Sequence, residues 1–143
     1  MLEIDKILLR AYTPIYMNTT SSDIEQCLEP AHGCVCFNIR KSARVITKLY
    51  EEALHPTGLR ATQFTVLVAT RVMGRATINS LAHGLVMDRT TLTRNMKPLE
   101  KQGFIRVITG KEDRREREVT LTRAGQNILL EALPLWKAVQ ENV

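Results

Sequence analysis

Glycine, proline and cysteine are scarce in this chain, and long hydrophobic runs are absent from it. Its 143 residues include 7 glycines, 5 prolines and 3 cysteines, too few for a collagen-like, low-complexity or disulfide-framework protein. No apolar run approaches the roughly 18 residues that cross a bilayer, which argues against a transmembrane protein. Charged residues interrupt the first 17 positions, unlike the apolar middle of a secretory signal. We therefore expect a cytoplasmic protein with no membrane partner.

The composition is that of a globular protein with a slight excess of positive charge. Hydrophobic residues make up 44% of the chain and charged residues 24%, which predicts a real core. The length fits one domain. Twenty lysines and arginines against 15 acidic residues give a formal charge of +5, which indicates a polyanionic partner if the charge is clustered.

The chain reads as an arm followed by a single domain. We expect residues 1–32, which contain a polar run at 18–23, to form an N-terminal arm and linker, and residues 33–143 to form the domain. Apolar residues at helical spacing predict helices at 36–54 and 61–73, the latter with an inward stripe of Phe64, Leu67, Val68 and Val72. Two shorter helices should follow at 78–85 and after Asp88 to about residue 102, with Thr77 and Asp88 as their N-caps.

After Gly103 the pattern changes from helical to alternating. Residues 105–107 and 118–121 alternate between apolar and polar, which predicts a two-stranded hairpin. A charged loop at 109–117 joins the strands, and Thr122 should cap a final helix that contains Trp136. The predicted fold class is mainly α with a small β-hairpin wing (α+β). The order of helix, turn, helix and basic hairpin is that of a winged helix-turn-helix, here at about 59–121.

The second helix of the predicted pair carries residues suited to DNA. Leu92, Met96 and Leu99 form its inward stripe. Arginine can pair bidentately with guanine edges, and threonine and lysine suit phosphates or base edges. The predicted contacts on the other faces are Arg89, Thr90, Thr91, Thr93, Arg94 and Lys97. An ordinary solvated helix face is the alternative, but the charged hairpin that follows favours DNA binding.

Several motifs resemble those of the MarR family of bacterial transcriptional regulators. They lie at 81–82, 87–94, 99–105, 113–115 and 119–122, and the most specific is a D-x-R followed by an aliphatic-x-L-T. The resemblance implies that Arg115 enters the minor groove, that Asp113 pairs with it, and that Arg114 lies beside them at the wing tip. A narrow minor groove has enhanced negative potential, which attracts a guanidinium.

The resemblance also implies an assembly and a ligand class. Members bind a near-palindromic operator as homodimers, with half-sites about one helical turn, roughly 34 Å, apart. The helices at 33–55 and 122–143 should form the dimer, because they carry more apolar residues than a small winged-helix core can cover. The family places a crevice for small aromatic ligands between the dimer interface and the DNA-binding part. We therefore expect double-stranded DNA and a second copy as partners, and a small aromatic ligand or a peroxide as a candidate signal.

The cysteines suggest a redox signal. Residues 36–50 resemble the first helix of the peroxide-sensing branch, which implies that Cys36 is oxidised and that Tyr50 helps to bind the oxidised form. A helix N-terminus stabilises a thiolate, which favours oxidation. Cys34 and Cys27 are candidate resolving thiols. Two alternatives stay open: Cys36 is a buried structural residue, or these cysteines and His32 bind a metal.

The sequence indicates a regulator and not an enzyme. It contains no Ser/His/Asp set, glycine-rich phosphate loop or paired-carboxylate arrangement, and no cofactor is expected. A thiol-based peroxide-reducing enzyme that uses Cys36 is the rival hypothesis from another class. The leading hypothesis is a sequence-specific DNA-binding transcriptional regulator, a homodimeric repressor released by a small molecule or an oxidant.

Overall fold

A computed structural model describes residues 33–110 and 115–142, in two compact units. The boundary between them falls after Leu49, within the first described helix, α3 (Val35–Leu54). Residues 33–49 are therefore almost entirely helical, and their apolar side chains are largely exposed in the single chain: Val35, Phe37, Ile39 and Ile46. The expected N-terminal arm, residues 1–32, lies outside the described residues.

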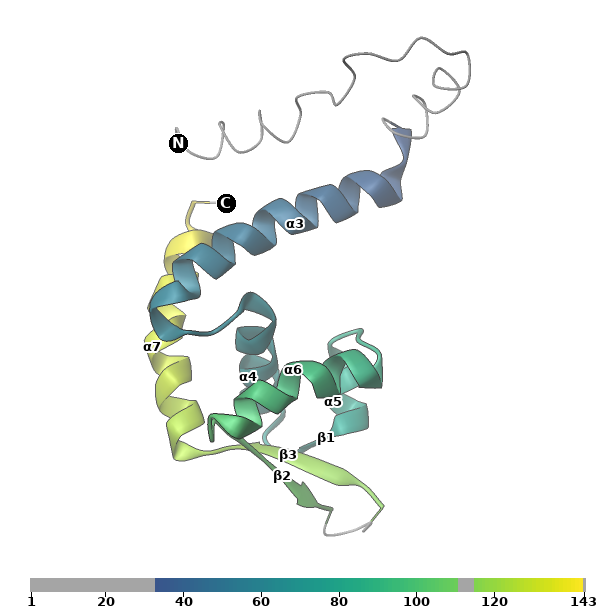
Figure 1. Cartoon of the computed structure of the whole chain (residues 1–143), viewed down its shortest axis with the longest axis vertical. Coiled ribbons are helices and arrows are strands. Elements are labelled where there is room, and N and C mark those ends of the chain that lie inside the picture. The colour runs from purple at the N-terminus through teal and green to yellow at the C-terminus, as the bar shows by residue number, and fades with distance from the viewer. Residues whose placement is uncertain (1–32, 111–114, 143) are drawn as a thin grey trace. The chain divides into compact units, whose positions relative to one another are not determined.

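The second unit, Tyr50–Glu141, combines several helices with a small sheet at one edge, from which the hairpin projects (Figure 1). After α3 a 3-10 turn, η1 (His55–Thr57), ends at Gly58, whose φ of +71° lies in the left-handed region that glycine tolerates best. The elements that follow are α4 (Ala61–Met73), β1 (Ala76–Thr77), α5 (Ile78–Gly84), α6 (Arg89–Lys101), β2 (Ile105–Thr109), β3 (Arg117–Leu121) and α7 (Arg123–Gln140).

The sheet has three antiparallel strands in the order β1-β3-β2. The predicted hairpin is present as β2 and β3, which pair from Ile105 opposite Leu121 to Thr109 opposite Arg117. The sheet also has a third strand that was not predicted, because β1 pairs with the other side of β3, Ala76 opposite Val119. A strand of two residues shows no alternation, so the sequence pattern did not reveal it.

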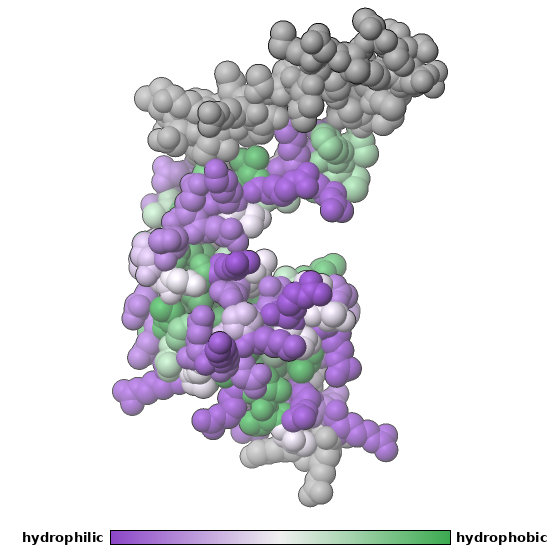
Figure 2. All heavy atoms as spheres, in the orientation of Figure 1, coloured by the Kyte–Doolittle hydropathy of each residue, from purple (hydrophilic) through white to green (hydrophobic). Residues whose placement is uncertain are grey.

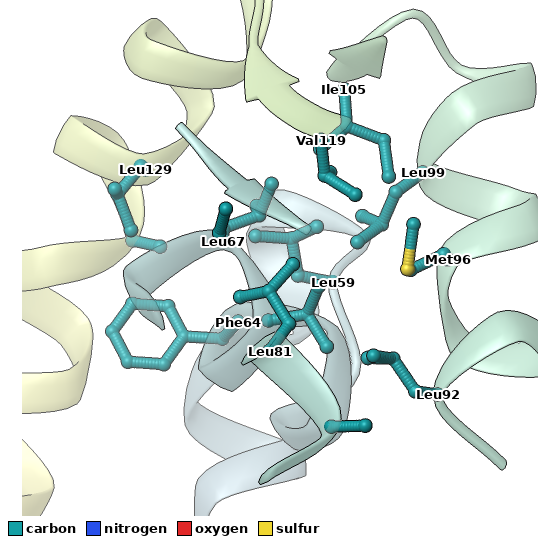
Figure 3. Packing of buried hydrophobic residues seen from close by; sticks show 14 of the residues in the cluster. Leu59, Phe64, Leu67, Leu81, Leu92, Met96, Leu99, Ile105, Val119 and Leu129 are labelled. Atoms are coloured by element: carbon teal, nitrogen blue, oxygen red, sulfur yellow. The ribbon is translucent and has the colours of Figure 1, made fainter. Parts of the chain in front are cut away.

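One apolar cluster joins these elements (Figure 3). Phe64 and Leu67 of α4 lie between Leu129 of α7 and the inward side chains of α6, and Val119 and Ile105 close the cluster from the sheet. Trp136 of α7 stacks on Phe64 within the same chain, with ring centroids 6.2 Å apart. The mainly α architecture with a β wing is therefore confirmed.

The predicted inward stripe of α4 needs one correction. Val72 is 80% exposed, whereas Val66 and Thr70 are buried. Thr70 is accommodated because its hydroxyl donates to the carbonyl of Val66 at 2.7 Å, which satisfies the polar group inside the core. Because threonine is a polar residue, the pattern of apolar residues did not predict that this position is buried.

Both predicted helix caps on the way to α6 are confirmed. The side chain of Thr77 accepts from the N–H of Ser80 at 3.0 Å, and that of Asp88 accepts from the N–H of Thr91 at 2.8 Å. These caps fix where α5 and α6 begin. In the part of the chain that the structure describes, no helix has the length and apolar character needed to cross a membrane.

Candidate nucleic-acid interface

The carboxylate of Asp88 caps the first turn of α6. Asp88 has an extended backbone, and its side chain accepts from the Thr91 N–H. Hydrogen bonds from the side chain and the backbone N–H of Thr91 hold the pKa of Asp88 below its usual value. The charged carboxylate also interacts favourably with the positive end of the helix dipole. The first turn of α6, with Arg89 and Thr90, is therefore held in a fixed position.

The outward side of α6 is a shallow basic surface. The predicted inward residues Leu92, Met96 and Leu99 are all buried. A concavity of about 400 Å³ lies on the outward side, lined by Arg89, Thr90, Thr93, Arg94 and Lys97. The structure thus brings together five of the six residues predicted on this helix, and three of the five are cationic.

The threonines of this helix differ in what their hydroxyls do. The Thr93 hydroxyl donates to the carbonyl of Arg89 at 2.7 Å, and Thr91, which does not line the concavity, hydrogen-bonds to Asp88 through its side chain. Both hydroxyls therefore serve the helix itself. The arginines and Lys97 retain the donors best suited to phosphate oxygens and guanine edges.

Contacts on its inner side fix the orientation of α6. The Thr62 hydroxyl of α4 lies 3.5 Å from the Asn95 side-chain oxygen of α6, beside the apolar contacts of Met96 in the core. Pro98 lies inside the helix, which continues to Lys101 before Gly103 adopts a φ of +73°. Because these contacts hold the inner side, the outward residues are presented on a rigid element.

The wing follows α6 directly and carries exposed arginines. The N–H of Gly110 donates to the carbonyl of Glu116 at 2.9 Å, one step beyond the last strand pair, so the loop is closed at its base. Arg115 and Arg117 are exposed beside this closure. Asp113 and Arg114, predicted at the tip, lie outside the described residues.

Arg117 was not singled out from the sequence. It stands opposite Thr109 at the end of the ladder, and Arg106, also exposed, stands on β2 opposite Thr120. Arg106 occupies the polar position between Ile105 and Val107 in the sequence pattern. Arg117 has the parity of Val119 and Leu121 in the pattern, so the alternation gave no signal for it. Hydrophilic side chains cover much of the surface of this unit in the view of Figure 2.

The wing is tied to α7 at one junction. The Thr122 N–H donates to the carbonyl of Phe104 at 3.0 Å, and its hydroxyl donates to the carbonyl of Gly103 at 2.5 Å. The Thr122 oxygen also accepts from the N–H of Gly125 at 3.0 Å, which caps α7. The side chain of Thr122 therefore hydrogen-bonds both to the base of the wing and to the start of α7.

The two cysteines that the structure describes lie at the start of α3. Cys34 and Cys36 are exposed, and Cys34 accepts from the N–H of Asn38 through its carbonyl. The alternative of a cysteine buried within its own chain is thus not supported for Cys36. Tyr50 lies 14 residues further along the sequence, equivalent to about 21 Å of helical rise. Cys27 and His32 lie outside the described residues, and among the residues that are described no three His, Cys, Asp or Glu side chains gather as a metal site.

Comparisons with known proteins agree with this geometry. The model of the MarR family matches residues 59–117. The chain is 33% identical over 109 residues to the HTH-type transcriptional regulator SarZ of Staphylococcus haemolyticus, covering 76% of this chain and 71% of that protein. It is 30% identical over 91 residues to the organic hydroperoxide resistance transcriptional regulator of Bacillus subtilis, covering 64% of this chain and 62% of that protein.

A solved structure extends the similarity to a protein bound to DNA. The M. tuberculosis transcriptional regulator MosR, in complex with DNA, superposes with a TM-score of 0.71 at 38% identity. The match covers 76% of this chain and 79% of that one. All of these similar proteins are named as transcriptional regulators, and none is named as an enzyme.

Proposed function

Because this chain belongs to the MarR family of DNA-binding transcriptional regulators, we propose that it is a homodimeric repressor that leaves its operator when a cysteine is oxidised. The observation that carries the DNA-binding part is the outward side of α6, where Arg89, Arg94 and Lys97 line one concavity. Cations held on a rigid helix are what a phosphate backbone and guanine edges attract.

We assign α6 to the major groove and the wing to the adjacent minor groove. Arg94 and Lys97 lie on the outward side of α6, while Arg115 is exposed where the wing loop closes. Phosphate contacts position such a protein, and contacts to base edges give it sequence specificity. Asp113 and Arg114 complete the proposed wing contacts.

A second copy of the chain is the proposed occupant of the apolar sides of α3 and α7. Val35, Ile39 and Ile46 recur at steps of four and seven along α3 and are 70%, 63% and 41% exposed. Leu130 of α7 is 65% exposed, and Leu133 lies one turn later. Burying such side chains is the main driving force of association. Size-exclusion chromatography with light scattering should give a mass of twice 16.2 kDa. A stable monomer at micromolar concentration would contradict the dimer.

The proposed signal is oxidation at Cys36. This thiol is exposed in the first turn of α3, where a peroxide can reach it from solvent. An organic hydroperoxide oxidises the thiol to a sulfenic acid and is itself reduced to the alcohol, so that one oxygen atom passes to sulfur. The sulfenic acid then condenses with a second thiol, Cys34 or Cys27 of either protomer, to form a disulfide and water. If Tyr50 assists, the helical distance requires the tyrosine of the second protomer.

The experiment starts from DNA that the reduced protein itself selects from a random duplex library. Fluorescence anisotropy on that duplex is recorded before and after stoichiometric cumene hydroperoxide, for the wild type and for Cys36→Ser. We expect the reduced protein to bind tightly, oxidation to abolish binding, and Cys36→Ser to bind with or without peroxide.

Other outcomes separate the parts of the proposal. Tight binding that is indifferent to peroxide keeps the DNA-binding function and directs the search to a small aromatic ligand. Failure to select any sequence would contradict the regulator itself. Repeated turnover of peroxide with a thiol reductant, in place of a single oxidation event, would favour the rival peroxide-reducing enzyme.

A further inference from the structure

The turn between α5 and α6 contains a valine in a backbone conformation that valine disfavours. Val86 has a φ of +51° and is the one non-glycine residue with positive φ among those that the structure describes. Its N–H donates to the carbonyl of His83 at 3.1 Å, and the N–H of Met87 donates to the carbonyl of Ala82 at 2.9 Å. This pair of bonds is the Schellman motif, in which the left-handed position is usually glycine.

The fold requires the conformation of this turn but makes no use of the valine side chain. The motif directs Met87 onto the core, where it packs as a partly buried residue. Val86 itself is 94% exposed, so its two methyl groups bury almost no area within the chain. A β-branched residue is a true outlier at positive φ, and strained residues of this kind concentrate at functional sites. In the protein without a bound partner, the valine side chain therefore makes the backbone conformation less favourable and gains almost no buried contact in return.

We propose that Val86 is a DNA contact whose methyl groups meet the C5-methyl group of a thymine in the major groove. It precedes the N-cap of α6 by two residues and Arg89, which lines the basic concavity, by three. Three peptide units span at most about 11 Å. In a helix-turn-helix the N-terminal residues of the second helix contact base edges, and apolar side chains read thymine through its methyl group. The inference rests on the proposed placement of α6 in the groove.

The test compares Val86→Gly and Val86→Ala with the wild type on the selected duplex. Glycine relieves the strain, so this variant should fold at least as well as the wild type, and a weaker complex cannot be attributed to unfolding. Alanine removes the two methyl groups without adding the flexibility of glycine. Val72→Ala is the matched control, because Val72 is also highly exposed, at 80%, but lies in ordinary helical backbone on α4.

Uracil supplies the second half of the test, because it lacks only the methyl group of thymine. We expect both Val86 variants to weaken binding by about 3- to 10-fold, the effect of burying one or two methyl groups. Replacing the thymines of the duplex by uracil should weaken the wild type by a similar factor and leave the Val86 variants unchanged. Val72→Ala should bind like the wild type.

Each other result overturns the inference. Wild-type affinity in both variants would mean that Val86 does not touch DNA. Equal losses on thymine and uracil duplexes would assign Val86 to the sugar-phosphate backbone and remove its role in specificity. Weakening by Val86→Gly alone would show that turn rigidity, and not the methyl groups, matters. If the wild type selects no DNA, the proposed function fails first, which is a distinguishable outcome.

Discussion

At the scale of single residues, the tightest constraint lies at Gly125 in the first turn of α7. A Cβ atom there would lie 1.9 Å from the carbonyl oxygen of Phe104 and 2.8 Å from its carbon. Both atoms belong to the backbone at the base of the wing, which Thr122 also holds by hydrogen bonds. The absence of a side chain at Gly125 therefore lets α7 start directly against the backbone of Phe104, the residue before β2.

Gly125→Ala should destabilise the fold by about 1–3 kcal/mol, the usual cost of forcing an extra methyl group into a closely packed site. The higher helix propensity of alanine, about 1 kcal/mol, offsets part of this cost. Urea unfolding followed by Trp136 fluorescence measures the difference. The neighbouring substitution Gln126→Ala, at an exposed position, should change stability by less than about 0.5 kcal/mol. Equal stability of the two variants would contradict the close approach.

At the scale of elements, α6 depends on the ionisation of its cap. Thr91 lowers the pKa of Asp88 through two hydrogen bonds. A carboxyl whose pKa is lower in the folded than in the unfolded state stabilises the fold above its unfolded pKa. That contribution is lost as the pH falls through the folded pKa. The start of the proposed recognition helix should therefore weaken in acid, below about pH 4.

Asp88→Asn isolates this contribution, because asparagine is an equally good N-cap but does not titrate. The melting temperature of each protein is measured by circular dichroism at pH 7 and at pH 3. The melting temperature of the wild type should fall further between pH 7 and pH 3 than that of the variant, since every other acidic group is common to both. Parallel losses would show that the Asp88 carboxylate contributes nothing to the pH dependence.

At the scale of the whole molecule, the excess of positive charge can attract DNA only where the fold brings several basic side chains together. Arg89, Arg94 and Lys97 meet on one concavity, and Arg115 stands at the wing. Arg94→Ala should cost on the order of 1–3 kcal/mol of binding free energy on the selected duplex if the side chain reads a base edge. Arg115→Ala should weaken binding most where the minor groove is narrow.

Salt dependence distinguishes the roles of these arginines. A lost phosphate contact weakens binding to all sequences and lowers the salt slope by about one, whereas a lost base contact relaxes specificity at one position. Arg71→Ala, at an exposed position of α4, is the matched control and should leave anisotropy titrations unchanged. Wild-type affinity of Arg115→Ala would refute the wing assignment.

Local chemistry made much of this protein readable from its sequence. The caps at Thr77, Asp88 and Thr122 were recognisable, because a short polar side chain before an apolar repeat satisfies the first N–H groups of a helix wherever it occurs. The inward stripe of α6 followed from helical periodicity in the same way, which assigned its basic residues to the other side.

What the tertiary structure decided depends on contacts between distant segments. Pairing with β3 alone makes residues 76–77 a strand, and the surrounding core determines that Thr70 is buried and Val72 exposed. In the local Schellman turn between α5 and α6 the positive φ falls on Val86 and not on the nearby Gly84, which the sequence pattern did not indicate. The sequence by itself thus determined the helices, their caps and the basic face. Only the tertiary structure decided the third strand and the close approach at Gly125, because each depends on atoms of distant segments that the chain brings together only by folding.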